Sequence, residues 1–130
     1  MQDHLFVYGT LMRGFDHPMA KLLSRSAEFI GEARCRGRLY LVKHYPGLVL
    51  SDDASDVVFG ELVRLHTPQA SFVTFDDYEG CGPGVASPQY LRQVLPVTLE
   101  DGTVSEAWTY VYNRPLSKLP TIASGRFLTG

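Results

Sequence analysis

The chain has 130 residues, the length of one ordinary domain, with 45% hydrophobic and 20% charged residues. This balance supplies a buried core and lacks the low hydrophobicity and high charge of disordered chains. Twelve basic against 14 acidic residues give a formal net charge of −2, so no overall positive field favours nucleic acid or an anionic membrane surface. We expect a single domain over residues 1–130 that binds neither.

The chain also lacks the usual signals for membranes and metals. Its apolar stretches fall far short of the ~20 residues that a helix needs to cross a bilayer, and no basic and apolar leader precedes the first strand. The expected compartment is the cytoplasm, where Cys35 and Cys81 would stay reduced. The histidines, at positions 4, 17, 44 and 66, form no spacing typical of a metal site, so we expect no metal.

The first half of the chain predicts three strands and one helix. Residues 5–8 form a short buried strand that ends before Gly9, and residues 18–24 form a helix with a proline in its first turn. Residues 28–42 mostly alternate in polarity, which predicts a long strand or the bent arm of a hairpin. Tyr45-Pro46-Gly47 indicates a turn, and residues 57–65 predict another strand.

The second half predicts one helix followed by a hairpin. Pro68 opens the helix, which runs to about Tyr78 and is stopped by Gly80. A glycine- and proline-rich loop leads to strands at residues 90–99 and 104–112, joined by an Asp-Gly turn. Six or seven strands with two short helices, not in strict alternation, predict an α+β fold whose mixed, mainly antiparallel sheet curls into a small barrel.

The end of the second helix carries an unusual acid. Phe72, Phe75 and Glu79 share one helical face, which directs a carboxylate toward the core. Burial and the negative end of the helix dipole would both raise the pKa of Glu79 toward the range useful for general acid or base catalysis. The alternative is that the helix frays after Tyr78 and leaves Glu79 in water.

Other charged residues have structural explanations. Asp76 and Asp77 lie on the same turn as Glu79, and one of them is expected to pair with Arg92 in a surface or rim contact. Three arginines share one face of the predicted strand, at Arg34, Arg36 and Arg38. They could follow phosphates, but a solvated outer face that discourages edge pairing suits an acidic chain better.

A second candidate site follows the first strand, at Tyr8-Gly9-Thr10-Leu11. Gly9 lets the backbone turn close to a ligand, and the N–H groups that follow can form a small anion-binding concavity. Thr10 adds a hydroxyl and Arg13 a charge. The alternative is a plain turn from strand to loop.

Six segments taken in order carry a family pattern: Phe6–Leu11, Tyr45–Gly47, Val58–Leu62, Phe75–Gly80, Tyr90–Arg92 and Ala107–Tyr112. Together they resemble the gamma-glutamylcyclotransferase-like family over nearly the whole chain. The most specific feature is Tyr-Gly-Thr-Leu at the first turn with Asp-x-Tyr-Glu-Gly about 70 residues later.

The resemblance implies a small barrel with a pocket and a cofactor-independent enzyme. Its expected activity releases 5-oxoproline and a free amine from a small γ-glutamyl amine or peptide, by attack of the substrate's α-amine on its own γ-carbonyl. Glu79 matches the family's catalytic glutamate and would act as general base and acid. The loop whose backbone binds the glutamyl end matches Tyr8, Gly9, Thr10 and Leu11. No partner beyond this substrate is implied.

One segment departs from the family pattern. Many bacterial members carry a Ser-Gly-Asp-Trp-like stretch near the end, where this chain has Ser124-Gly125-Arg126-Phe127. If that tail borders the pocket, the exchange of an acid for a base would change which leaving amine is accepted, or mark a member without activity. The alternative function is therefore a pocket protein that binds γ-glutamyl or other carboxylate ligands without turnover.

Overall fold

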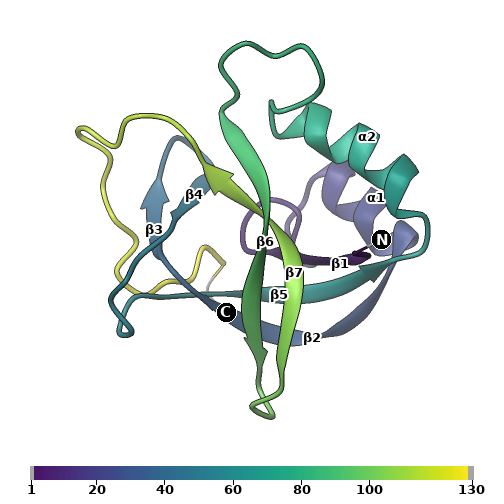
Figure 1. The fold of residues 1–130 in the computed structure, drawn as a ribbon, viewed down its shortest axis with the longest axis horizontal. Coiled ribbons are helices and arrows are strands. Elements are labelled where there is room, and N and C mark those ends of the chain that lie inside the picture. Colours follow the sequence, from purple (N-terminus) through teal and green to yellow (C-terminus); the bar gives the residue numbers. More distant parts are fainter. Residues whose placement is uncertain (1, 129–130) are drawn as a thin grey trace.

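A computed structural model describes residues 2–128 of the chain (Figure 1). Within this part the elements follow in the order β1 (His4–Val7), α1 (Pro18–Ser26), β2 (Ala27–Arg36), β3 (Arg38–Leu41), β4 (Pro46–Val49), β5 (Val57–Leu65), α2 (Pro68–Tyr78), β6 (Tyr90–Leu99) and β7 (Val104–Tyr112). The predicted bounds of β5, α2, β6 and β7 are confirmed, and α1 is two residues longer than predicted.

Five strands close into a barrel. They are hydrogen-bonded in the order β1-β5-β2-β6-β7, and a parallel pairing of β1 with β7 closes the ring. β4 and β3 extend the sheet beyond β7, with β4 and β7 parallel. The other neighbouring strands pair antiparallel. This confirms the predicted α+β fold with a mixed, mainly antiparallel barrel and two short helices.

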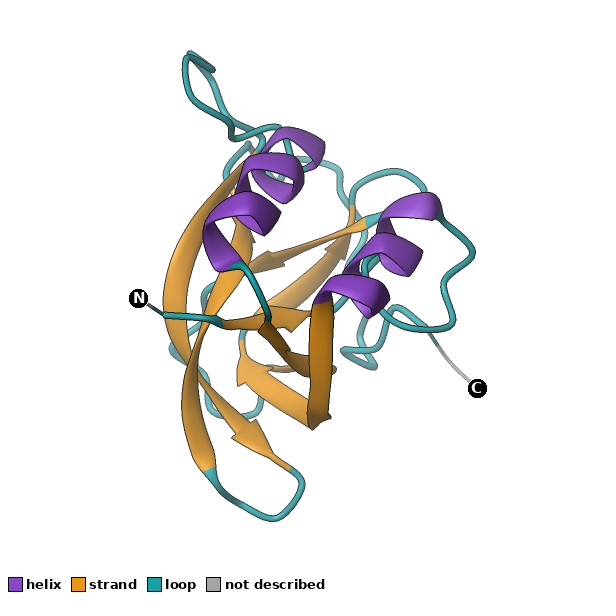
Figure 2. Cartoon of the chain, turned by 90° about the vertical axis from the view of Figure 1, so that its right-hand side faces the viewer, coloured by secondary structure: helices purple, strands orange, loops and turns teal. Residues whose placement is uncertain are grey.

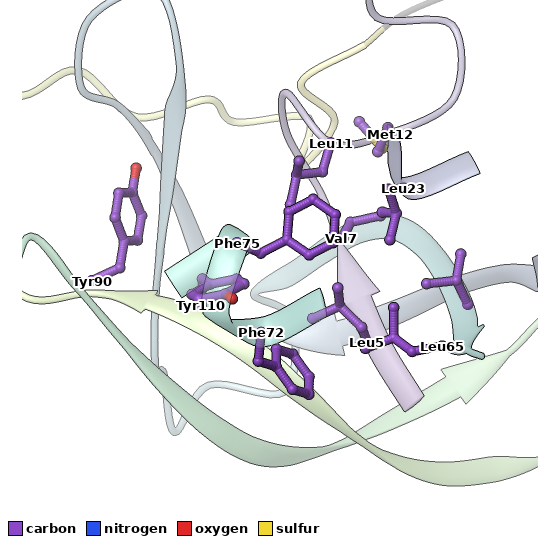
Figure 3. Packing of buried hydrophobic residues seen from close by; sticks show 11 residues of the cluster. Leu5, Val7, Leu11, Met12, Leu23, Leu65, Phe72, Phe75, Tyr90 and Tyr110 are labelled. Carbon is purple, nitrogen blue, oxygen red and sulfur yellow. The ribbon is translucent and has the colours of Figure 1, made fainter. Parts of the chain in front are cut away.

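Both helices pack on the same side of the barrel (Figure 2). Phe72 and Phe75 of α2 belong to one buried cluster with Leu5 and Val7 of β1 (Figure 3). Phe75 is completely buried, and burial of one such ring stabilises the fold by roughly 1.5–3 kcal/mol. This packing brings the C-terminal end of α2 to the end of β1, where residues 8–11, here called the Tyr8 loop, begin.

Two predicted boundaries are wrong. Residues 28–42 are not one strand, because the chain turns at Gly37 and β3 leaves to pair with β4. Pro46 and Gly47 are not a turn but the start of β4; the turn precedes them, where the Val42 N–H donates to the Tyr45 carbonyl at 3.0 Å. A proline is tolerated as the first residue of a strand, and Gly47 leaves space for the Tyr112 ring, which an added Cβ would meet at 2.9 Å.

Candidate active site

A cavity of about 210 Å³ lies where β1, α2, β6 and β7 meet. Its walls include Tyr8, Gly9, Thr10, Leu11 and Glu79, which the sequence singled out for binding or catalysis. The expected contribution of Arg13 is wrong, because Arg13 lies outside this cavity and its side chain pairs with Glu61 at 3.3 Å. The other residues that line the cavity are Phe6, Val7, His17, His44, Tyr45, Pro46, Tyr78, Gln89, Tyr90 and Tyr110. Residues about 70 positions apart in the chain thus face one space.

The position of Glu79 follows from the way α2 ends. Gly80 adopts a left-handed backbone with φ of 73°, which costs glycine no steric strain. Its N–H donates to the Asp77 carbonyl at 3.1 Å, and the Cys81 N–H donates to the Asp76 carbonyl at 2.9 Å. This pair of bonds is the Schellman motif, and it leaves Glu79 as the C-cap residue.

Glu79 lies on the cavity wall and is only partly exposed. Within residues 2–128, no group hydrogen-bonds or ion-pairs with its carboxylate. Burial raises the pKa of Glu79 to about 8, and the nearby negative charge of Asp76 adds to this effect. The helix does end at Tyr78, but Glu79 lines the cavity, so a carboxyl that can exchange protons near neutral pH borders this space.

Three residues of the Tyr8 loop that line the same cavity have backbone N–H groups without an acceptor in the described part of the chain. The N–H groups of Gly9, Thr10 and Leu11 meet no acceptor among the described residues, although all three residues are buried. Buried N–H groups are nearly always satisfied by protein, water or ligand. Three consecutive donors therefore favour an anion or a carbonyl oxygen at this wall.

Contacts on either side hold this loop in place. A Cβ on Gly9 would lie 2.8 Å from the Pro46 Cγ, so only glycine allows the loop to approach β4 this closely. The Thr10 hydroxyl and the Tyr78 hydroxyl are 2.8 Å apart and hydrogen-bonded. This bond ties the loop to the residue directly before Glu79, and so links the free donors to the carboxylate.

The Tyr8 hydroxyl is already engaged by the protein. It donates to the Tyr110 carbonyl at 2.6 Å and accepts from the Leu48 N–H at 3.1 Å. Burial raises the pKa of Tyr8 well above its ordinary value, with a contribution from the Glu79 charge. The hydroxyl therefore stays protonated and joins β1, β4 and β7 at the floor of the cavity.

Sequence reasoning missed the rest of the cavity wall. Tyr90 and Tyr110 come from β6 and β7, whose segments were predicted as strands and noted as family features but not as parts of the site. Tyr45 and Pro46 were interpreted as a turn. His17 caps α1 by accepting from the Met19 N–H. Its position directly before Pro18 could have predicted that cap. It could not have predicted that the His17 ring lies beside the Tyr78 ring, with the ring centroids 5.3 Å apart.

The predicted pairing of an acid with Arg92 is confirmed for Asp76, but it is more than a surface contact. Arg92 donates to both carboxylate oxygens, at 2.9 and 3.1 Å. The Tyr110 hydroxyl donates to the same carboxylate at 2.7 Å. Side-chain exposure is only 17% for Asp76 and 23% for Arg92, so the pair is largely shielded from water.

Two other surfaces lie outside this cavity. Arg34, Arg36 and Arg38 are exposed and alternate with buried residues. They do not share one strand as predicted, because Arg34 and Arg36 belong to β2 and Arg38 to β3. The tail does not border the cavity: Arg126 lies over the Phe59 ring at 3.9 Å, and Phe127 packs on Phe15 at 5.8 Å between ring centroids. The exchange of acid for base in the tail therefore has no direct contact with the Glu79 wall.

Two findings bear on other site types. Over residues 2–128, no cluster of three or more histidine, cysteine, aspartate or glutamate side chains is arranged to hold a metal ion. In the same described part of the chain, neither helix has the length and apolar character needed to cross a bilayer.

Comparison with known protein families identifies the class of proteins to which this fold and cavity belong. The family model "Gamma-glutamyl cyclotransferase, AIG2-like" matches residues 5–129. The chain belongs to this family, as its sequence motifs indicated.

Individual relatives agree with this assignment. The chain is 32% identical to the "Gamma-glutamylcyclotransferase family protein ytfP" of Citrobacter rodentium, over 95% of this chain and 94% of that protein. It is 34% identical to the "Gamma-L-glutamyl-butirosin B gamma-glutamyl cyclotransferase" of Niallia circulans, over 85% of this chain and 67% of that protein. The crystal structure of an AIG2-like protein from Mus musculus superposes with a TM-score of 0.70 at 27% identity, covering 94% of this chain and 86% of the mouse chain.

Proposed function

We propose that this protein is a cyclotransferase that releases 5-oxoproline and a free amine from a small γ-glutamyl amine or peptide. Glu79 acts as general base and then as general acid, and the Tyr8–Leu11 loop binds the glutamyl group. The observation that carries the proposal is a cavity wall with a carboxylate and the N–H groups of Gly9, Thr10 and Leu11, none of which has a hydrogen-bond partner among residues 2–128. Family membership and the cyclotransferase named among the relatives support it.

The reaction requires a proton acceptor before bond formation. The substrate's α-amine is an ammonium at neutral pH and cannot attack until the ionised form of Glu79 takes a proton from it. The freed nitrogen then attacks the γ-carbonyl carbon, which closes a five-membered ring and leaves an oxyanion. The amide donors of Gly9, Thr10 and Leu11 can stabilise this oxyanion, or the α-carboxylate of the substrate.

Collapse of the intermediate reverses the proton flow. The carbon–nitrogen bond to the leaving amine breaks as protonated Glu79 returns a proton to that nitrogen. Over the whole reaction two protons leave the α-nitrogen and two reach the leaving nitrogen, so one carboxylate can carry them in succession. A pKa near 8 suits both steps, because neither protonation state of Glu79 is rare around neutral pH.

The test is a panel of γ-glutamyl amines and γ-glutamyl peptides, with 5-oxoproline measured by chromatography. Wild-type protein should release 5-oxoproline from at least one compound, and Glu79→Gln should reduce kcat by roughly 10²–10⁴. Asp77→Asn is the matched control, because it neutralises an exposed acid on the same helical turn. Binding of these compounds by calorimetry without any product would contradict the proposal and favour a non-catalytic binding protein.

A further inference from the structure

Asp76 holds a fixed position beside the proposed catalytic acid. It accepts three hydrogen bonds: two from Arg92 and one from the Tyr110 hydroxyl. Only an oxygen acceptor can serve all three donors, which is the role of an ionised carboxylate. Its two oxygens are thereby held in one orientation.

The arginine in this pair is itself immobilised. Its guanidinium lies over the Phe72 ring at 3.8 Å and over the Trp108 ring at 4.3 Å. Both rings belong to regular secondary structure, since Phe72 is part of α2 and Trp108 is part of β7. A planar guanidinium that stacks on aromatic rings and binds a carboxylate through two of its nitrogens is a rigid unit, in contrast to a mobile surface ion pair.

The Asp76 cluster also reaches the cavity. Asp76 precedes Glu79 by three residues at the end of α2, which places the two side chains on neighbouring positions of the helix surface. Tyr110, which donates to Asp76, is buried and forms part of the cavity wall. The Tyr8 hydroxyl in turn bonds the Tyr110 carbonyl, so the cluster is connected to the loop with the free N–H groups.

We propose that Asp76 is a positioning residue for Glu79: clamped by Arg92 and Tyr110, it keeps one negative charge beside the Glu79 carboxylate and favours its protonated form. This role rests on the proposed catalytic use of Glu79. Burial is the main cause of the raised Glu79 pKa, and the charge of Asp76 adds to it. Because the charge of Arg92 opposes that of Asp76, the pair adjusts how readily Glu79 gives up its proton. The pair thereby matches the acid to a reaction in which it must both take and return protons.

Other ionisable groups face Glu79 but are expected to add little charge. Those near its carboxylate or on the same cavity are Tyr8, Tyr45, Tyr78, Tyr90, Tyr110, Cys81, His17 and His44. Burial raises the pKa of Tyr8, Tyr78, Tyr90 and Tyr110 above the ordinary value and that of Cys81 to about 11, so these groups are neutral at pH 8. Tyr45 and the two histidines are common to all variants compared below, and their contributions cancel in the differences.

The experiment is a titration of the Glu79 carboxyl carbon by NMR in the full-length protein, with Glu79→Gln used to assign the signal. Asp76→Asn keeps the side-chain shape and one of the two acceptor oxygens but removes the charge, so it should lower the Glu79 pKa by roughly one pH unit. Arg92→Gln removes the opposing charge and should raise it. Asp77→Asn removes an exposed charge one residue away and should change it by less than a third as much, because solvent screens it.

The same variants are then compared in the pH profile of kcat/KM for 5-oxoproline release. The acidic limb should move to lower pH in Asp76→Asn and to higher pH in Arg92→Gln. If Asp76 and Arg92 had a purely structural role, both substitutions would reduce kcat/KM without moving the acidic limb of the profile in opposite directions. Equal pKa values in wild-type, Asp76→Asn and Arg92→Gln, in variants whose thermal unfolding shows a folded protein, would overturn the inference. If wild-type protein releases no 5-oxoproline, the proposed function fails, while the NMR titration still decides the role of Asp76.

Discussion

Replacing Glu79 with glutamine should stabilise the protein at alkaline pH while it removes the proposed base. The pKa of Glu79 is raised from an ordinary 4.5 to about 8 in the folded protein. A native state with the higher pKa binds more protons than the unfolded chain, so its stability falls as pH rises from about 4.5 to 8. One pH unit corresponds to about 1.4 kcal/mol, so ionisation costs the fold at most about 5 kcal/mol, and less where water solvates the carboxylate.

The assay is urea unfolding at a series of pH values from 4.5 to 9, for wild-type protein and Glu79→Gln. The difference in unfolding free energy between the two proteins should shift in favour of Glu79→Gln by a few kcal/mol between pH 5 and 8.5 and then level off. Asp77→Asn, with the exposed neighbouring acid changed, should show no such shift. A pH-independent difference between wild-type and Glu79→Gln would refute the burial of this carboxyl.

Three further substitutions test how the cavity and the tail are held. Tyr8→Phe removes a hydroxyl with two buried partners and should cost about 1–3 kcal/mol in urea unfolding; a cost near zero would contradict these bonds. Gly9→Ala brings a Cβ to 2.8 Å from Pro46 and should weaken 5-oxoproline binding in calorimetry several-fold. An unchanged affinity would show that the loop does not bind this ligand. Gly125→Ala combines φ of 70° with a Cβ that would clash with the Val57 carbonyl oxygen, so its midpoint of thermal unfolding should fall well below that of Gly84→Ala, whose added Cβ meets nothing within 4 Å.

Local sequence signals predicted the elements that border the site. Pro68 and Gly80 bound α2 because proline suits the first turn of a helix and glycine adopts the left-handed backbone that ends one. The Asp101-Gly102 pair likewise predicted the turn between β6 and β7, where Gly102 has φ of 88°. Such signals act over a few residues and need no knowledge of the rest of the fold.

The spacing of Phe72, Phe75 and Glu79 also pointed to the site, but it left two environments open for the carboxylate. Helical periodicity states which side chains share a face, and not what lies opposite that face. The Tyr8 loop left a similar question open in the sequence, since a strand followed by glycine occurs in many turns without a ligand. The family resemblance joined the two segments before any contact between them was known.

Pro46 and Arg92 show what the sequence could not reveal. A Tyr-Pro-Gly segment has the composition of a turn, and its use as the start of β4 depends on the Tyr90 hydroxyl, which donates to the Pro46 carbonyl at 2.6 Å. Arg92 could pair with either acid on the α2 turn, and its choice of Asp76 depends on Phe72 and Trp108, over which it stacks. These contacts join residues separated by 16 to 44 positions.

The sequence by itself determined the helix and strand boundaries of the second half, the α+β class, the family and the residues worth testing, because each depends on local backbone preference or on a motif pattern. Only the tertiary structure decided that Glu79 lines a cavity, that amide donors without an acceptor among residues 2–128 lie on the same wall, and that residues 124–127 lie elsewhere. The physical reason is that a cavity is made by long-range packing: burial of Phe75 against β1 and closure of β1 on β7 bring distant segments together, and no short stretch of chain encodes that meeting.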